Sequence, residues 1–247
     1  MTEQQAPSSN MSEAGRLAGI FWEPKPVFQD LAARPRFWAP LIIMTVLAVV
    51  LMVSFSRVVG FESMTRRQIE ASPRTAQMPP EQRERAIQMG LKFAVPFAYG
   101  GAALGFTVSA LAIAGILLGC VNLLGGAKVS YPQAFSITCY SFLPSGLATI
   151  LAMVVMFLKD PADFDLQHPL PLNLGAFLDK SAVGSFVYSL AGSLDLFSIW
   201  VLLLLALGFS SAARKMSFGK ALALVSLPWA VYVLLKSSLA GFTGAAG

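Results

Sequence analysis

Long uninterrupted apolar stretches dominate the chain and predict membrane-spanning helices. Residues 37–56, 93–127 and 129–158 each contain no charged side chain. About 20 apolar residues are enough for a helix to cross the hydrocarbon core of a bilayer. A fourth apolar stretch, 182–213, carries a single charge, and a fifth, 218–239, has lysines near its ends. The pattern therefore predicts an all-α, polytopic helical membrane protein with five transmembrane helices.

The expected spans occupy residues 37–57, 93–124, 132–158, 183–213 and 218–239. We place them in one membrane domain covering residues 17–240. The polar residues 1–16 are expected to form a disordered tail, because they lack the apolar side chains that a core requires. Residues 241–247 are expected to form a C-terminal tail.

Residues 17–31 mix apolar and charged side chains before the first span. Pro24 and Pro26 exclude one continuous helix there, because an internal proline breaks the hydrogen-bond ladder. We expect a short amphipathic segment that lies at the membrane surface. The alternative is a plain tether between the tail and the first span.

Small residues recur on one face of the second span. At about 100° per residue, four glycines fall within roughly an 80° sector. They are Gly101, Gly105, Gly115 and Gly119. Such a stripe allows close approach of another helix, so we predict a packing face there for a protein partner or a second copy. Pro144 and Pro228 lie inside the third and fifth spans and predict kinks.

Two short turns resemble each other. The segment 128–135 (KVSYPQAF) matches 215–222 (KMSFGKAL) at the lysine, the serine and the alanine. Each segment lies between two expected spans and precedes a span with an internal proline. One interpretation is a duplicated helical hairpin, which would place both turns on one face of the membrane. A chance match is the alternative.

Charge is sparse, at 13% of residues against about 25% in soluble domains. The net charge of +5 does not indicate a nucleic-acid partner, because the cations sit at span ends and in the first loop. Basic residues favour the cytoplasmic side, so we expect the N-terminus inside and the C-terminus outside. The loop at 58–92 is also basic and falls outside in this arrangement, against the rule.

Residues able to support catalysis or metal binding are few. The only histidine, His168, has no nearby histidine or cysteine, which argues against a metal site. Three aspartates in the same loop lack the EF-hand pattern and are interpreted as a solvated acidic loop. They are Asp160, Asp163 and Asp165. Cys120 and Cys139 fall inside spans and are interpreted as inert thiols. We therefore predict no enzyme activity, no cofactor and no metal.

Asp195 is the only charged side chain between residues 181 and 213. A carboxylate in hydrocarbon is costly and is a functional candidate by default. In one interpretation it lies within the helical bundle and serves transport or assembly. In the other, Gly192 and Ser193 break the helix and Asp195 caps the helix that follows, near the membrane interface. Residues 182–191 would then be a separate interfacial or re-entrant piece.

Several short motifs are shared with a known family. They are Phe21-Trp22-Glu23-Pro24 with Phe28, Arg34-Pro35-Arg36-Phe37-Trp38, Val59-Gly60, Tyr131 with Phe135, Tyr140-Ser141-Phe142-Leu143-Pro144, and Leu194-Asp195-Leu196-Phe197-Ser198-Ile199-Trp200. In order and spacing the chain resembles the Yip domain family of Rab/Ypt-interacting membrane proteins, and most of all its prokaryotic branch.

The resemblance implies five spans, a cytoplasmic N-terminus and a bacterial inner-membrane location. Eukaryotic members act in vesicle traffic by binding prenylated GTPases, through a long acidic N-terminal domain. Residues 1–31 of this chain have no counterpart of that domain. We therefore expect a non-enzymatic integral membrane protein that organises the membrane or binds partner proteins. The alternative is a transporter for ions or small solutes that uses Asp195.

Overall fold

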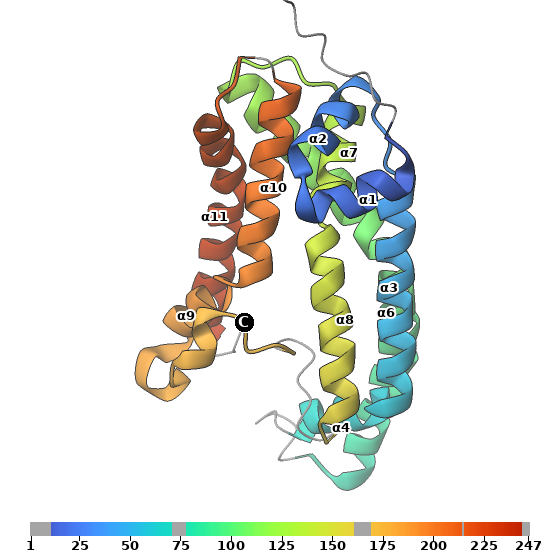
Figure 1. Cartoon of the computed structure of the whole chain (residues 1–247). Helices are drawn as coiled ribbons and strands as arrows, with labels where there is room; N and C mark the ends of the chain where they lie inside the picture. Colours follow the sequence, from blue (N-terminus) through green and yellow to red (C-terminus); the bar gives the residue numbers. More distant parts are fainter. Residues whose placement is uncertain (1–10, 71–77, 161–168, 214, 244–247) are drawn as a thin grey trace, which may run out of the picture. The chain divides into compact units, whose positions relative to one another are not determined.

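The computed structural model describes residues 11–70, 78–160, 169–213 and 215–243. Regular structure in these residues is helical, apart from an isolated bridge between Asn173 and Asp195 (Figure 1). The predicted all-α class is confirmed. Of the aspartates expected in an acidic loop, Asp163 and Asp165 lie outside the described residues, as does His168.

Among the described residues, four helical stretches are long and apolar enough to cross a membrane, judged by length and composition. They are Trp38–Val58, Pro80–Leu124, Tyr131–Leu158 and Phe218–Phe242. A shorter apolar helix, Leu196–Ala212, has 17 residues, or about 25 Å at 1.5 Å per residue. The membrane-protein class is thus confirmed, and a fifth crossing depends on this shorter helix.

The chain divides into two compact units. The first comprises residues 1–41, 110–145 and 172–247. Its elements are α1 (Glu13–Trp22), α2 (Pro24–Ala33), the start of α3 (Trp38–Val58), the end of α6 (Pro80–Gly119), the π-helical η1 (Cys120–Leu124), α7 (Tyr131–Ser141), η2 (Leu174–Phe177), α9 (Lys180–Gly192), α10 (Leu196–Ala212) and α11 (Phe218–Thr243).

The second unit comprises residues 42–109 and 146–171. It contains most of α3, α4 (Phe61–Glu70), the first part of α6 and most of α8 (Leu143–Leu158). Phe55 and Met156 are fully or almost fully buried in its core. The ring of Phe61 lies edge-on to that of Phe55, with centroids 5.7 Å apart. Tyr99 donates a hydrogen bond to the hydroxyl of Ser56 at 2.9 Å, which links α6 to α3.

Helix α7 forms the centre of the first unit. Eight consecutive residues, Ala134 to Ser141, are buried. Helix α2 packs on α7 and α10 and buries Val27, Phe28 and Leu31. Gly208 of α10 makes this packing possible, because a Cβ there would lie 3.0 Å from the ring of Phe28. The first unit is therefore built by helices that surround α7 on several sides.

The N-terminal residues form two helices that are part of this packing. As predicted from Pro24 and Pro26, the helix breaks between Trp22 and Pro24. The tether alternative is wrong, because α2 buries its apolar face. The expected tail at 1–16 is also too long: α1 begins at Glu13, where the Ser12 side chain accepts a hydrogen bond from the amide of Gly15. A serine N-cap satisfies an amide that the helix leaves unpaired.

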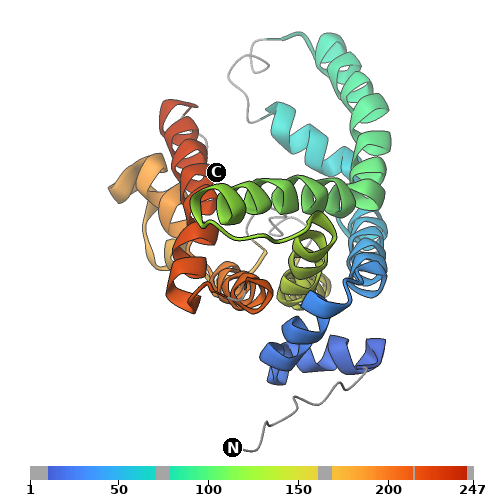
Figure 2. The ribbon, with the colours of Figure 1, turned by 90° about the horizontal axis from the view of Figure 1, so that it is seen from above.

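Helix α11 contacts different neighbours at its two ends. Near its start, Lys220 donates to the carbonyl of Gly125 at 2.8 Å. Near its end, Ser237 donates to the hydroxyl of Ser189 on α9 at 3.4 Å. Figure 2 shows α9 beside α11, in agreement with these contacts. Phe218 and Ser237 are about 28 Å apart along the helix at 1.5 Å per residue, close to the ~30 Å thickness of a hydrocarbon core.

The expected third and fourth spans are both interrupted. Helix α7 ends at Ser141 and α8 begins at Leu143, immediately before Pro144. The stretch 183–213 is two helices, α9 and α10. Pro228, in contrast, lies inside the continuous helix α11. Helix α11 continues to Thr243, three residues into the expected tail at 241–247.

Candidate functional site

Asp195 is the N-cap of α10, as one of the two sequence interpretations expected. Its Oδ1 accepts hydrogen bonds from the backbone amides of Phe197 at 2.9 Å and Ser198 at 3.0 Å. Its Oδ2 accepts a hydrogen bond from the hydroxyl of Ser198. Both carboxylate oxygens are thus bound by the first turn of the helix. The positive end of the helix dipole also favours a negative charge at this position.

The backbone around Asp195 is fixed by the segment that precedes α9. The amide of Leu196 donates to the carbonyl of Leu172, and the amide of Leu174 donates to the carbonyl of Leu194, both at 3.2 Å. This short pairing forms the bridge between Asn173 and Asp195. Asp195 therefore lies at a structured break between α9 and α10, and its side chain is partly exposed.

A partly buried ionic cluster joins α1 to α2. The guanidinium of Arg16 is 3% exposed and donates from Nε to Oδ2 of Asp30 at 2.7 Å. It also donates from Nη1 to Oε1 of Glu13 at 2.9 Å. Two carboxylates on either side therefore neutralise one buried cation. A buried charge is tolerated when it is paired and hydrogen-bonded in this way.

The same cluster reaches the central helix and the start of the first span. Tyr140 of α7 is fully buried, and its hydroxyl donates to Oε2 of Glu13 at 2.9 Å. Arg36, which is exposed, donates to Oε1 of Glu13 at 3.4 Å. Glu13 thus links α1, α7 and the segment before α3. We call Glu13, Arg16, Asp30 and Tyr140 the N-terminal clamp.

Helix α7 carries several buried polar side chains. Thr138 donates back to the carbonyl of Ala134 at 2.8 Å. The hydroxyls of Ser136 and Ser141 are buried and have no hydrogen-bond partner among the described residues. Cys139 of the same helix is also buried, whereas Cys120, in η1, is partly buried. The buried polar atoms of α7 lie in the most enclosed helix of the first unit.

The short motifs of the sequence meet in the first unit. Phe21 contacts Trp200 edge to face, with ring centroids 5.9 Å apart. Phe37 contacts Phe135 at 4.8 Å. Tyr131 stacks on Phe135 at 6.3 Å. Motif residues that are far apart in the sequence thus form contacts between α1 and α10, and between the segment before α3 and α7.

The two similar turns lie side by side in the first unit. Ser130 caps α7 in a capping box with Gln133, and Ser217 accepts a hydrogen bond from the amide of Lys220 at 3.3 Å. Lys220 of the second turn donates to the carbonyl of Gly125, close to the first turn. Both turns therefore use the shared serine to begin a helix. Their proximity agrees with the hairpin interpretation.

The four glycines of the second span do not form a tight contact in the described structure. A Cβ at Gly101, Gly105 or Gly119 would have no neighbour within 4 Å, and one at Gly115 would lie 4.0 Å from Tyr131. Other glycines lie in tight contacts within the chain: a Cβ at Gly146 would lie 2.9 Å from the sulfur of Met44. The predicted packing face on α6 therefore stays a prediction, since no described residue packs tightly against these glycines.

Titratable groups do not gather into a metal-binding group within the described ranges. Asp179 instead accepts hydrogen bonds at the start of a helix. The hydroxyl of Ser181 donates to its Oδ1 at 2.6 Å and the amide of Ser181 at 2.8 Å. These hydrogen bonds hold the pKa of Asp179 below its ordinary value. Like Asp195, this carboxylate caps a helix, here α9.

Sequence reasoning missed the N-terminal clamp. The sequence pattern places Glu13 and Arg16 in the expected tail and Asp30 in the expected surface segment, and Tyr140 stands out only as part of a family motif. One signal was available: Glu13 and Arg16 are one helical turn apart. Nothing local indicated that Tyr140, 127 residues away, would complete the pair.

These features define a helical integral membrane protein whose N-terminal helix pair packs on the central helix. The sequence model of the Yip1 domain matches residues 18–239. The chain belongs to the Yip1 domain family. Comparison with curated proteins found no match, and comparison with solved structures found none either.

Proposed function

We propose that this Yip-type membrane protein is non-enzymatic and works by binding partner proteins or organising the membrane. The observation that carries the proposal is the hydrogen bonding of the Asp195 carboxylate. Its two carboxylate oxygens are bound by the first turn of α10. A transporter that used this acid would need it to release those bonds in each cycle. The contacts therefore favour a structural role for Asp195 over the transport alternative.

The glycine face of α6 is the surface we propose for a protein partner or a second copy. Gly101 and Gly105 are one turn apart and open, whereas Gly208 and Gly146 are occupied by the chain's own side chains. Small residues allow two helix backbones to approach closely in a bilayer, where van der Waals packing drives association. The open pair therefore offers a packing surface that no described side chain occupies.

We propose five crossings, with the N-terminus in the cytoplasm of a bacterial cell and the C-terminus outside its inner membrane. Helix α10 supports the fifth crossing. It starts at the level of α9, which contacts the end of α11, and it leads back to the turn at which α11 begins. The cations of the turn at 215–220 support a cytoplasmic location for that end. A reporter fused after Gly247 tests this: a cytoplasmic signal overturns the orientation.

The partner proposal is tested in native membranes with the full-length protein. Cross-linking followed by purification in mild detergent is expected to recover a stoichiometric partner or a second copy. Gly101→Leu with Gly105→Leu should remove that species, because two leucines fill the open face. Ala103→Leu is the matched control, since Ala103 is exposed and lies about 200° around the helix from Gly101.

Three outcomes would overturn the proposal. One is that the wild-type protein recovers no stoichiometric species. The second is that the glycine variant and the Ala103→Leu control retain the species equally. The third is a substrate flux in reconstituted vesicles that Asp195→Asn abolishes at normal protein levels, which would establish the transport alternative.

A further inference from the structure

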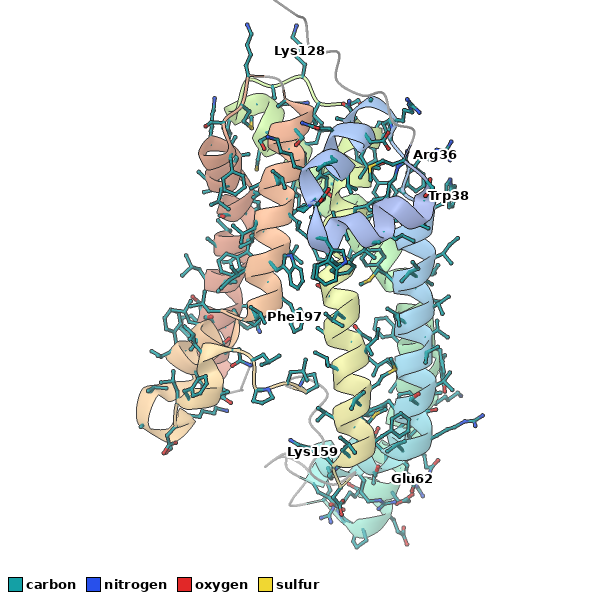
Figure 3. The ribbon with its side chains drawn as sticks, viewed as in Figure 1. Arg36, Trp38, Glu62, Lys128, Lys159 and Phe197 are labelled. Atoms are coloured by element: carbon teal, nitrogen blue, oxygen red, sulfur yellow. The ribbon has the colours of Figure 1, made fainter. Side chains whose placement is uncertain are left out.

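Three segments of the first unit concentrate positive charge at one of its ends. They are residues 34–36, 125–133 and 215–220, and they contain no aspartate or glutamate. Their cations are Arg34, Arg36, Lys128, Lys215 and Lys220, all of them exposed. We call these five residues the basic end. Figure 3 shows Lys128 and Arg36 projecting outward from it.

Specific contacts hold the three segments together. Gln133 donates from Nε2 to the carbonyl of Ala32 at 2.6 Å, and the rings of Phe37 and Phe135 are 4.8 Å apart. Lys220 donates from Nζ to the carbonyl of Gly125 at 2.8 Å. The cations are therefore brought together by the fold of the first unit, although they are up to 186 residues apart in the sequence.

Exposed aromatic residues accompany the cations. Three helices begin at this end, and each begins with an aromatic residue: Trp38 of α3, Tyr131 of α7 and Phe218 of α11. Their side chains are 64%, 39% and 42% exposed. Tryptophan and tyrosine favour the level of the lipid headgroups. Aromatic rings beside cations therefore place this end at a bilayer interface and argue against a nucleic-acid partner.

The charge is asymmetric along the first unit. The opposite end, residues 172–195, contains Asp179, Lys180 and Asp195, for a net charge of −1. Helix α10 separates the two ends by 17 residues, or about 25 Å. Little of the positive charge is neutralised internally: Arg36 reaches Glu13, but Lys128 and Lys215 make no side-chain bond to any described residue. Free cations at a single interface attract anionic lipids.

We propose that the basic end binds the headgroups of anionic phospholipids. Clustered Lys and Arg beside membrane helices contribute about 1 kcal/mol each to binding an anionic surface, or roughly fivefold in affinity. The phosphate oxygens accept hydrogen bonds from Lys128, Lys215 and Arg34, and the aromatic residues contact the glycerol and upper acyl region. This lipid contact is separate from the glycine face and does not depend on it.

The test uses the full-length protein in detergent with equimolar phosphatidylglycerol and phosphatidylcholine, and native mass spectrometry measures which lipid stays bound. The wild-type protein should retain phosphatidylglycerol preferentially. Lys128→Gln with Lys215→Gln should reduce that preference by at least roughly fivefold, the effect of one near-surface cation. These two lysines are chosen because Lys220 and Arg36 have internal partners.

The matched control is Lys92→Gln with Lys159→Gln, which removes two exposed lysines of the second unit. It should leave the preference unchanged. A wild-type protein without preference, or equal loss in both double variants, overturns the proposal. A salt titration of the wild-type protein adds a measurement that needs no variant: a preference that does not weaken with added salt contradicts it. Full displacement of the lipid by inorganic phosphate would also overturn it, since the site would then recognise the free ion.

Discussion

The hydroxyl of Tyr140 donates a 2.9 Å hydrogen bond to Glu13, across 127 residues of sequence. Tyr140 is fully buried on α7, and Glu13 lies in the first turn of α1. Glu13 is in turn bound by Arg16, which binds Asp30 on α2. One partly buried chain of polar contacts thus fixes the N-terminal helix pair to the central helix.

Removing the Tyr140 hydroxyl should weaken the attachment of the N-terminal helix pair to α7. Hydrogen bonds to charged groups contribute about 1.5–3 kcal/mol, so we expect Tyr140→Phe to lower the free energy of unfolding by that order. The measurement is SDS-induced unfolding followed by circular dichroism, together with hydrogen exchange in α1. Tyr131→Phe is the control for a tyrosine on the same helix, whose hydroxyl bonds the carbonyl of Leu111 and not the clamp. Faster exchange in α1 for both variants alike would contradict a specific role for Tyr140.

Arg16 should be the most sensitive residue of the clamp. Breaking a buried ion pair by removing one partner costs about 3–5 kcal/mol, because the other charge remains buried. Arg16→Met is therefore expected to destabilise strongly, whereas Arg16→Met with Asp30→Leu should recover most of the loss. The readout is the unfolding midpoint of the three proteins. A double variant as unstable as the single one would show that the cost comes from lost packing and not from the stranded Asp30 carboxylate.

Asp195 should tolerate loss of charge but not loss of its acceptor oxygen. An asparagine caps a helix nearly as well as an aspartate, whereas an alanine cap costs about 1 kcal/mol. We expect Asp195→Asn to keep near wild-type stability and Asp195→Ala to unfold earlier in thermal melts. Ser198→Ala, which removes the hydroxyl bonded to the same carboxylate, should fall between them. Equal stability of the alanine and asparagine variants would contradict the capping role.

Two glycines should respond in opposite ways to an added methyl group. A Cβ at Gly208 would collide with Ile137 and lie 3.0 Å from Phe28, so Gly208→Ala should destabilise by about 1–3 kcal/mol through overpacking. Gly101 has nothing within 4 Å, so Gly101→Ala should be neutral, or stabilising by up to about 1 kcal/mol from helix propensity. Thermal unfolding of both single variants tests this contrast, and a Gly208→Ala protein of unchanged stability would refute the close approach of α2 and α10.

Asp179 gives a dependence on pH. Hydrogen bonds from the Ser181 hydroxyl and amide lower the pKa of Asp179 below its ordinary value of 3.8. A lowered pKa in the folded state means that the carboxylate stabilises the protein above pH 3.8, and that this contribution is lost as the pH falls through the folded-state pKa. Amides of α9 should therefore lose protection at acidic pH in the wild-type protein. Asp179→Asn should show less of this change, and an identical response in both proteins would argue against the assignment.

The sequence by itself determined the features that depend on local pattern. Uninterrupted apolar stretches established the membrane helices, because length and hydrophobicity alone decide whether a helix can cross a bilayer. Pro24 with Pro26 divided the N-terminal segment. Gly192 with Ser193 allowed a break in the next stretch, and Asp195 allowed a helix to start at Leu196, since proline and capping residues act within one turn.

Only the tertiary structure decided which residues meet across the chain. Arg16 and Tyr140 share one cluster because α1, α2 and α7 pack together, and no spacing in the sequence encodes that contact. The same holds for the glycines: Gly208 and Gly101 look equivalent in sequence, yet one is filled by Phe28 and Ile137 and the other is open. Burial and partnership depend on neighbours from distant segments, and those neighbours are set only when the helices assemble.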